Sequence, residues 1–272
     1  MGFQILVNSA AHDAKTKCWK YVDDMTFAEN RLASQIGSMQ TDLEKFRQWS
    51  EENHLKLNPS KCQAIQVCFS KTPPNLIDLR IGTDSIPYVS EAKVLGLWLQ
   101  SDLKWSVHIQ KLLEKANKKM FLLRTLKRFG FGPSELSAVY TGYIRPVLEY
   151  ADVIWHSGLT RIHSDEIESI QRRACKTILG RHSASYDDNL KVCNLETLED
   201  RRLTHCIQFA QTLSNNSRTC SLLPPTRFEQ HRRQLRKSQK LSQIRCRTTR
   251  FKKSPIPFFI DVLKHVKPNT LF

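Results

Sequence analysis

Two adjacent aspartates, Asp23 and Asp24, are the residues whose type and spacing point most directly to chemistry. They lie in the segment KCWKYVDDMTFAE, residues 17–29, where aromatic and β-branched residues flank the acidic pair. This pattern predicts two short strands that meet at an acidic turn, and a hairpin is the simplest shape. Adjacent like charges raise one another's pKa unless a cation compensates, and a divalent metal would do so. The alternative is an acidic turn without a metal.

A group of lysines lies on one side of the helix predicted for residues 106–128. The group consists of Lys111, Lys115, Lys118 and Lys119. An apolar face at helical spacing accompanies it, formed by Ile109, Leu112, Ala116, Met120 and Leu123. Such a group suits contact with the phosphates of a nucleic-acid duplex. The alternative is a helix face that is only solvated.

The first part of the chain is predicted to combine short strands with one helix. Apolar positions from about Ser34 to Asn53 recur every three or four residues, which indicates an amphipathic helix packed on a sheet. Alternation in residues 62–70 predicts a further strand after the Asn58-Pro59 turn. The segments LIDLRIG and KVLGLWL predict more short strands, with a turn around residues 82–84 between them.

Helical patterns dominate the rest of the chain. After the helix at 106–128, with Ser106 as a candidate N-cap, they resume at about 134–155, 163–180 and 196–213. The basic segment after Pro224 has weak apolar periodicity and is predicted to be an exposed helix or disordered. The sequence therefore predicts an α+β fold in three parts: a small antiparallel sheet with one packed helix in residues 1–100, a helical region in 101–223, and a basic tail in 224–272.

The positive charge is concentrated beyond residue 90. The net charge is +16, whereas residues 1–90 hold 10 basic and 10 acidic side chains. This asymmetry favours a polyanionic partner. Nucleic acid fits better than a membrane, because no apolar stretch approaches about 20 residues and the N-terminus lacks a signal pattern. An intracellular protein, cytoplasmic or nuclear, is the expectation.

The eight cysteines are scattered, with no C-x-x-C pair, and are expected to be reduced and mostly buried thiols. A zinc site at His205, Cys206, Cys220 and His231 is a weaker alternative, because that spacing matches no finger or knuckle pattern.

Several segments together carry a resemblance to a known family. Tyr21-Val22-Asp23-Asp24 resembles the Y-x-D-D hairpin in the palm of reverse transcriptases. The amphipathic helix, LKLNPSKC, KVLGLWLQSDLKWSVHI and the basic helix then follow in the order and spacing of non-LTR retrotransposon reverse transcriptases. YIRPVLEYADVIW and IESIQRRACKTILG are similar to the thumb and post-thumb blocks of jockey- and CR1-like elements. The resemblance covers about residues 17–215.

The resemblance implies RNA-directed DNA synthesis with Mg²⁺ or Mn²⁺, on an RNA template and a DNA primer. Asp23 and Asp24 match the hairpin carboxylates, and Asp23 is the first choice as a direct metal ligand. Lys61 matches the next motif, where a lysine could neutralise the leaving pyrophosphate; an ordinary turn lysine is the alternative. The turn at residues 94–97, with Leu95 and Gly96 at its centre, resembles the primer grip.

One departure from the family limits what the resemblance implies. The family's further metal-binding aspartate lies on a palm strand well upstream of the hairpin, and Asp13 is the sole carboxylate ahead of it here. We therefore expect a truncated polymerase that is inactive by itself, so whether this chain is an enzyme stays open. The alternatives are a non-catalytic nucleic-acid-binding remnant that uses the basic thumb and tail, and a decaying relic without a stable fold.

Overall fold

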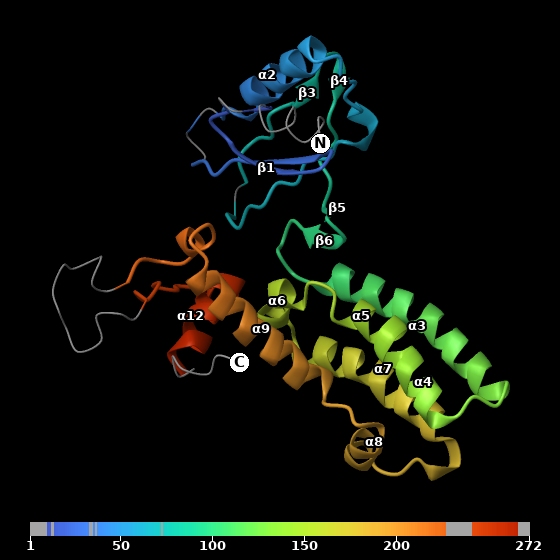
Figure 1. Ribbon diagram of the computed structural model, residues 1–272. Coiled ribbons are helices and arrows are strands. Elements are labelled where there is room, and N and C mark those ends of the chain that lie inside the picture. The colour runs from blue at the N-terminus through green and yellow to red at the C-terminus, as the bar shows by residue number, and fades with distance from the viewer. Residues whose placement is uncertain are drawn as a thin grey trace. The chain divides into compact units, whose positions relative to one another are not determined.

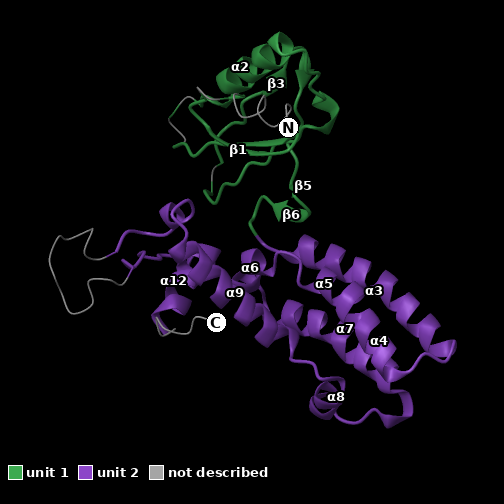
Figure 2. Ribbon diagram, viewed as in Figure 1, with its two compact units in different colours: residues 1–103 green, residues 104–272 purple. Residues whose placement is uncertain are grey.

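The computed structural model describes residues 10–11, 14–32, 35, 37–71, 73–226 and 241–265. The chain divides into two compact units, residues 1–103 and 104–272 (Figures 1 and 2). The predicted combination of small antiparallel strand pairs with several helices is confirmed. Asp13, Ser34, Ile36, His231 and part of the basic tail lie outside the described residues.

The described part of the first unit contains three separate hairpins and one long helix. Its core contains buried Leu43, Leu79, Ile81 and Ile86, with Phe27 packed against them. The bounds are β1 (Lys17–Tyr21), β2 (Asp24–Ala28), α2 (Met39–Glu52), a 3₁₀ turn (Pro59–Lys61), β3 (Arg80–Ile81), β4 (Asp84–Ser85), β5 (Glu91–Val94) and β6 (Leu97–Gln100). Each odd-numbered strand pairs antiparallel with the next one.

The predicted helix after the hairpin is confirmed, although its first turn begins later than the sequence suggested. Helix α2 starts at Met39. Its apolar face packs as the spacing predicted: Phe46 lies 5.7 Å from Phe27 and 5.9 Å from Trp49, between ring centroids. The helix therefore holds strand β2 from one side.

Two details of the first unit differ from what the sequence predicted for its strands. The strand predicted in residues 62–70 does not form a ladder, and only an isolated bridge joins Ala64 to Tyr88. Val67 and Phe69 are exposed there, so the alternating pattern has no second layer to pack against. The described strands also form separate pairs rather than one sheet, because each partner follows a two-residue turn and the strands are too short to extend further.

A buried carboxylate ties α2 to the segment that leads into β1. Asp42 is 1% exposed and accepts a 2.8 Å hydrogen bond from the backbone N–H of Thr16. Burial alone would raise the pKa of Asp42, but the hydrogen bonds from Thr16 and Lys15 outweigh it and hold the pKa below the usual aspartate value. Asp42 thereby anchors the start of β1 one residue ahead of Lys17.

The second unit is helical throughout its described part. Its elements are α3 (Ser106–Arg128), α4 (Pro133–Val139), a π-helical turn (Tyr140–Ile144), α5 (Arg145–Leu148), α6 (Asp152–Trp155), α7 (Arg161–Leu179), α8 (Tyr186–Cys193), α9 (Leu198–Asn215), α11 (Thr249–Lys252) and α12 (Pro255–His265), with short 3₁₀ turns at 156–158, 180–182 and 220–222. Helices α3 and α7 run alongside each other (Figure 1).

The apolar face predicted for α3 is confirmed, since all five of its members are at most 5% exposed: Ile109, Leu112, Ala116, Met120 and Leu123. Ser106 is the first helical residue rather than the cap, which falls at Trp105. The single helix predicted for 134–155 is instead divided. Pro146 has no N–H to donate to the preceding turn, and the helix is interrupted there by the π-helical turn at 140–144. It is interrupted again at Ala151, which adopts a left-handed φ of 51°.

The basic tail contributes to the core of the second unit, which the sequence did not predict. Helix α12 lies beside α9 (Figure 1). Phe259 of α12 is 1% exposed and packs with Cys206, Ala210 and Leu213 of α9. Residues 255–265 lie beyond the arginine-rich segment 227–253, to which the prediction of an exposed helix or disorder applies. The prediction of mostly buried thiols is wrong, because among the eight free cysteines only Cys175 and Cys206 are buried.

Replacing Phe259 with alanine should destabilise the second unit by about 3–5 kcal/mol, the usual cost of removing a buried aromatic ring from a core. The measurement is the opening free energy of the α9 amides by native-state hydrogen exchange. Phe251→Ala is the matched control, because Phe251 is 44% exposed. Equal effects of the two substitutions would show that α12 does not pack as described.

Replacing Asp42 with alanine should leave the Thr16 N–H without its charged acceptor, at a cost of about 1.5–3 kcal/mol to the first unit. Because the folded pKa is lowered, the stabilisation is present above the pKa of an unfolded aspartate and is lost as the pH falls through the folded value. The Thr16 amide resonance should titrate with that lowered pKa in NMR spectra. Titration at or above the usual aspartate pKa would contradict the anchor, and Asp42→Asn should abolish the titration.

Candidate nucleic-acid and metal site

The register of the first hairpin places the acidic pair at its tip. Tyr21 pairs with Asp24, so Val22 and Asp23 form a two-residue turn. Two-residue hairpin turns need a positive φ at their first central position, which glycine or asparagine usually supplies. Here Val22 supplies it with a φ of 55°. A β-branched residue is strained in that region, and such strain tends to mark functional sites.

Both carboxylates at the tip are exposed to solvent. Within the part of the chain that the structure describes, neither Asp23 nor Asp24 has a hydrogen-bonded or ion-paired side-chain partner. Carboxylate oxygens are the donors that Mg²⁺ prefers, and Mg²⁺ commonly takes one or two of them together with water and phosphate oxygens. The pair therefore fits the chemistry of a divalent site. The described residues contain no cluster of three or more His, Cys, Asp or Glu side chains suited to a metal.

Lys61 forms no ion pair with the hairpin carboxylates among the described residues. It is exposed at the end of the 3₁₀ turn Pro59–Lys61. Among the described side chains it has no ion-paired partner.

Leu95 and Gly96 are the two central residues of the β5–β6 hairpin. Val94 pairs with Leu97, which leaves only these two residues in the turn. Both have positive φ, 47° at Leu95 and 86° at Gly96, as two-residue turns of type I′ require. Leucine is strained there and its side chain is 47% exposed, so the tip presents an apolar group to solvent. The turn expected at this position is present.

The structure separates the four lysines of α3 into two environments. Lys111, Lys115 and Lys118 are exposed, and Lys111 lies 3.6 Å from Glu114 on the same helix. The ammonium group of Lys119 instead lies 3.2 Å from the ring centroid of Tyr143 and donates to the Tyr143 carbonyl at 3.1 Å. We call Lys111, Lys115 and Lys118 the lysine row. Lys119 serves the packing of α3 on the π-helical turn.

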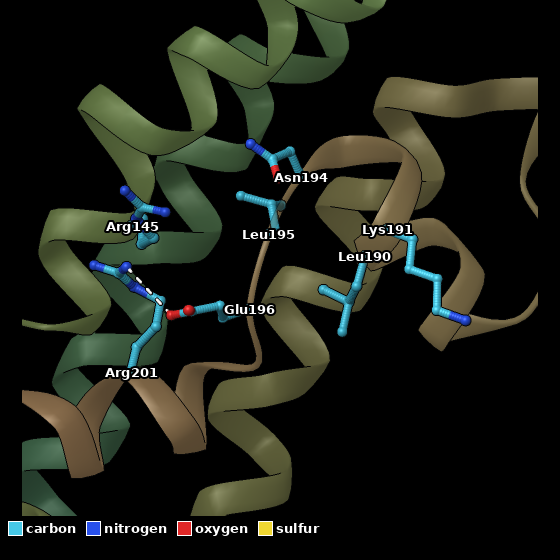
Figure 3. Close-up of a pocket in the computed structure, with 7 residues that line it drawn as sticks. All are labelled: Arg145, Leu190, Lys191, Asn194, Leu195, Glu196 and Arg201. Carbon is cyan, nitrogen blue, oxygen red and sulfur yellow. Dashed lines mark ion pairs between the residues drawn. The ribbon is translucent and has the colours of Figure 1, made fainter.

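One hollow of about 490 Å³ in the second unit holds cations that are already paired (Figure 3). Arg201 lies 3.9 Å from Glu196 and is hydrogen-bonded to Glu149. Arg145 lies 3.7 Å from the same Glu149 carboxylate. Arg201's pairing with Glu149 raises its pKa further. These ion pairs hold α5 against α9, so the hollow offers little free positive charge.

Sequence reasoning missed a second cationic surface, where the ends of α3 and α7 meet. A shallow pocket of about 390 Å³ is lined by Arg124, Lys127, Arg128, Lys176, Thr177 and Gly180. The signal was available in part, since Arg124 and Arg128 are four residues apart on one helix. Lys176 lies beside these arginines only because α7 packs against α3, and the sequence did not predict that packing.

No helix among the described residues combines the length and the apolar composition that crossing a bilayer requires.

Comparison with known proteins adds evidence for the first unit. No curated protein and no solved structure matches the chain. Residues 1–99 match the model of one family, described as reverse transcriptase (RNA-dependent DNA polymerase). Enzymes of this family act on nucleic acids and generally depend on divalent metals. The matched residues include the acidic hairpin, α2 and the Leu95-Gly96 turn, so the segment that holds the candidate metal ligands is the segment that matches a reverse transcriptase.

Proposed function

We propose that this chain carries the catalytic-hairpin end of the palm and the thumb of an RNA-directed DNA polymerase from a non-LTR retrotransposon. The observation that carries the proposal is the register of the first hairpin. It places two adjacent, exposed carboxylates at the tip of a Tyr-Val-Asp-Asp turn, within residues that match the reverse transcriptase family. The order of the downstream segments supports the non-LTR assignment.

In this proposal Asp23 and Asp24 would hold a divalent cation, with Asp23 as the first direct ligand. A bound Mg²⁺ or Mn²⁺ would stabilise charge on the phosphoryl oxygens during nucleotidyl transfer. The strained turn at Val22 places Asp23 between the two strands, next to Asp24, the first residue of β2. Asp42 acts indirectly, because it fixes the start of β1 and hence the position of the tip.

The Leu95-Gly96 turn and the lysine row would position nucleic acid. At Gly96 the absence of a side chain lets the backbone come close to a primer strand. The lysine row presents three exposed ammonium groups along one side of a 23-residue helix, and phosphates along a duplex suit such an array. Lys61 would neutralise pyrophosphate as it leaves.

A second candidate function is nucleic-acid binding without chemistry. The observation that favours it is the excess of exposed cations on α3, which needs no metal in order to bind a polyanion. Binding of a divalent metal at Asp23 and Asp24 separates the two functions, because a protein that only binds nucleic acid needs no metal there.

Replacing Asp23 with asparagine should weaken Mn²⁺ binding by at least about tenfold, because the substitution removes an anionic ligand. Electron paramagnetic resonance of Mn²⁺ with the full chain and a template–primer duplex measures this. Asp24→Asn should have a similar effect. Asp84→Asn is the matched control, since Asp84 is an exposed aspartate directly after another hairpin turn. Mn²⁺ affinity that is equal in Asp23→Asn and in the unaltered chain would refute the metal site.

Replacing Lys111, Lys115 and Lys118 with glutamate should weaken binding of an RNA–DNA duplex whatever its sequence. Each lost phosphate contact lowers the slope of log K against log salt by about 0.9, so the slope should fall by about 2.7. Lys119 is left unchanged because it packs on Tyr143. The control is a triple substitution with the same charge change at exposed Arg218, Arg245 and Arg247. Equal effects of the two triples would show that only net charge matters.

The duplex assay must use the full chain. Ending the chain near Leu223 would remove α12, whose Phe259 completes the core beside α9. The control triple therefore takes the place of truncation as a test of binding by the other basic segments.

A further inference from the structure

The C-terminal ends of α3 and α7 are held together by a specific contact. The ammonium group of Lys127 donates a 2.9 Å hydrogen bond to the carbonyl of Ile178. Gly180 has a φ of 57°, and a Cβ built there would lie 3.6 Å from the Lys127 side chain. Closer to the N-terminal ends of the same helices, the Arg173 guanidinium donates a 2.6 Å hydrogen bond to the Asn117 side-chain oxygen. The junction is therefore a fixed feature of the second unit.

Exposed cations surround this junction, and the pocket between the helices has no acidic residue in its lining. Arg124, Arg128 and Lys176 are exposed. None of the three has an ion-paired partner among the residues that the structure describes. We call these three residues together with Phe121 the arginine ridge.

The geometry of α3 places the ridge away from the lysine row. At 100° per residue, Phe121, Arg124 and Arg128 fall within one narrow strip of the helix. The lysine row lies on the other flank of the buried apolar strip. The two surfaces can therefore be altered separately.

The dipoles of the two helices account for only part of the positive charge at the junction. Each helix C-terminus carries roughly half a negative charge, so about one positive charge is enough to compensate both ends. Lys127 supplies it directly through its bond to a terminal carbonyl of α7. Arg124, Arg128 and Lys176 remain as an excess of three positive charges, which favours an anionic ligand.

An aromatic side chain lies in the same strip. Phe121 is 61% exposed, and Phe129, just beyond the end of the helix, is 76% exposed. Aromatic rings interleaved with cations are the arrangement by which proteins bind single strands, because unpaired bases stack on the rings while cations follow the backbone. A duplex hides its base faces and would leave the rings in water. The aromatic side chains therefore favour a single strand.

We propose that the arginine ridge binds single-stranded nucleic acid, with Arg124, Arg128 and Lys176 on the phosphates and Phe121 stacked on a base. This inference goes beyond the proposed function, which assigns a duplex to the lysine row. It rests on that function only for the class of ligand. A polymerase on an RNA template has unpaired template beside its duplex, and the ridge offers that strand a site of its own.

The experiment compares three triple glutamate variants of the full chain, each with the same change in charge. They alter the ridge (Arg124, Arg128 and Lys176), the lysine row (Lys111, Lys115 and Lys118) or the control positions (Arg218, Arg245 and Arg247). Fluorescence anisotropy measures binding of a uridine oligonucleotide of about 12 residues, its thymidine-DNA equivalent, and an RNA–DNA hybrid duplex, over a series of salt concentrations.

The ridge triple should weaken binding of both single strands by at least tenfold relative to the control triple. Its salt slope should fall by roughly 2, from about 0.7 for each of three phosphate contacts on a single strand. Hybrid binding should change less than threefold. The lysine-row triple should show the opposite pattern. Phe121→Ala, which leaves the charge unchanged, should weaken single-strand binding at least about fivefold.

Single-strand binding that is equal in the ridge and control triples would overturn the proposal, and so would an unchanged affinity in Phe121→Ala. Failure of the proposed function has a different signature, in which the lysine-row triple binds the hybrid as the control does while the ridge still binds single strands. Circular dichroism checks that α3 is retained. The glutamine version of the ridge triple, which places no negative charge at a helix C-terminus, should show the same order of effects if the glutamate version unfolds.

Discussion

The burial of one apolar strip of α3 determines which of the cations on this helix can meet a ligand. Ile109, Leu112, Ala116, Met120 and Leu123 are almost completely enclosed against the rest of the helical unit. Burial on this scale stabilises by about 1.5–3 kcal/mol for each large side chain, so the rotation of the helix about its axis is strongly fixed. With that rotation fixed, every other position on α3 has a defined direction. Lys119 turns toward Tyr143 and Lys127 bonds the Ile178 carbonyl, and the exposed cations of α3 divide between two flanks.

The acidic hairpin depends on a different constraint, the geometry of two-residue turns. Such turns require backbone conformations that glycine adopts without cost. Val22 and Leu95 adopt a positive φ without being glycine, and both are near half exposed. Strain of about 1–3 kcal/mol in such a conformation persists only where the surrounding structure enforces it, and it tends to occur at functional sites. The proposed metal at Asp23 and the proposed nucleic-acid strand near Gly96 would both lie at such strained tips.

The sequence predicted those features that depend on local periodicity and missed those that depend on tertiary contacts. The buried face of α3 followed from spacing, and its start followed from Ser106 as a candidate N-cap, one residue after the observed cap at Trp105. The acidic hairpin followed from its flanking residues. By contrast, residues 62–70 alternate as a strand would but lack a neighbouring strand. Helix α12 was not predicted, because it follows an arginine-rich segment and because its apolar face is buried only through its contact with α9.

The two cationic flanks also bear on the stability of α3 itself. Like charges three or four residues apart on a helix cost about 0.2–0.5 kcal/mol for each pair. Arg124 and Arg128 form such a pair, as do Lys111 and Lys115, while Glu114 is the sole acid on this helix. The apolar strip must therefore stabilise a helix that repels itself. Dissolved salt relieves this repulsion by screening, and a bound polyanion relieves it by direct contact. The charge pattern thus weakens the free helix slightly and strengthens it once a phosphate chain is bound, so binding and the folding of α3 are thermodynamically coupled.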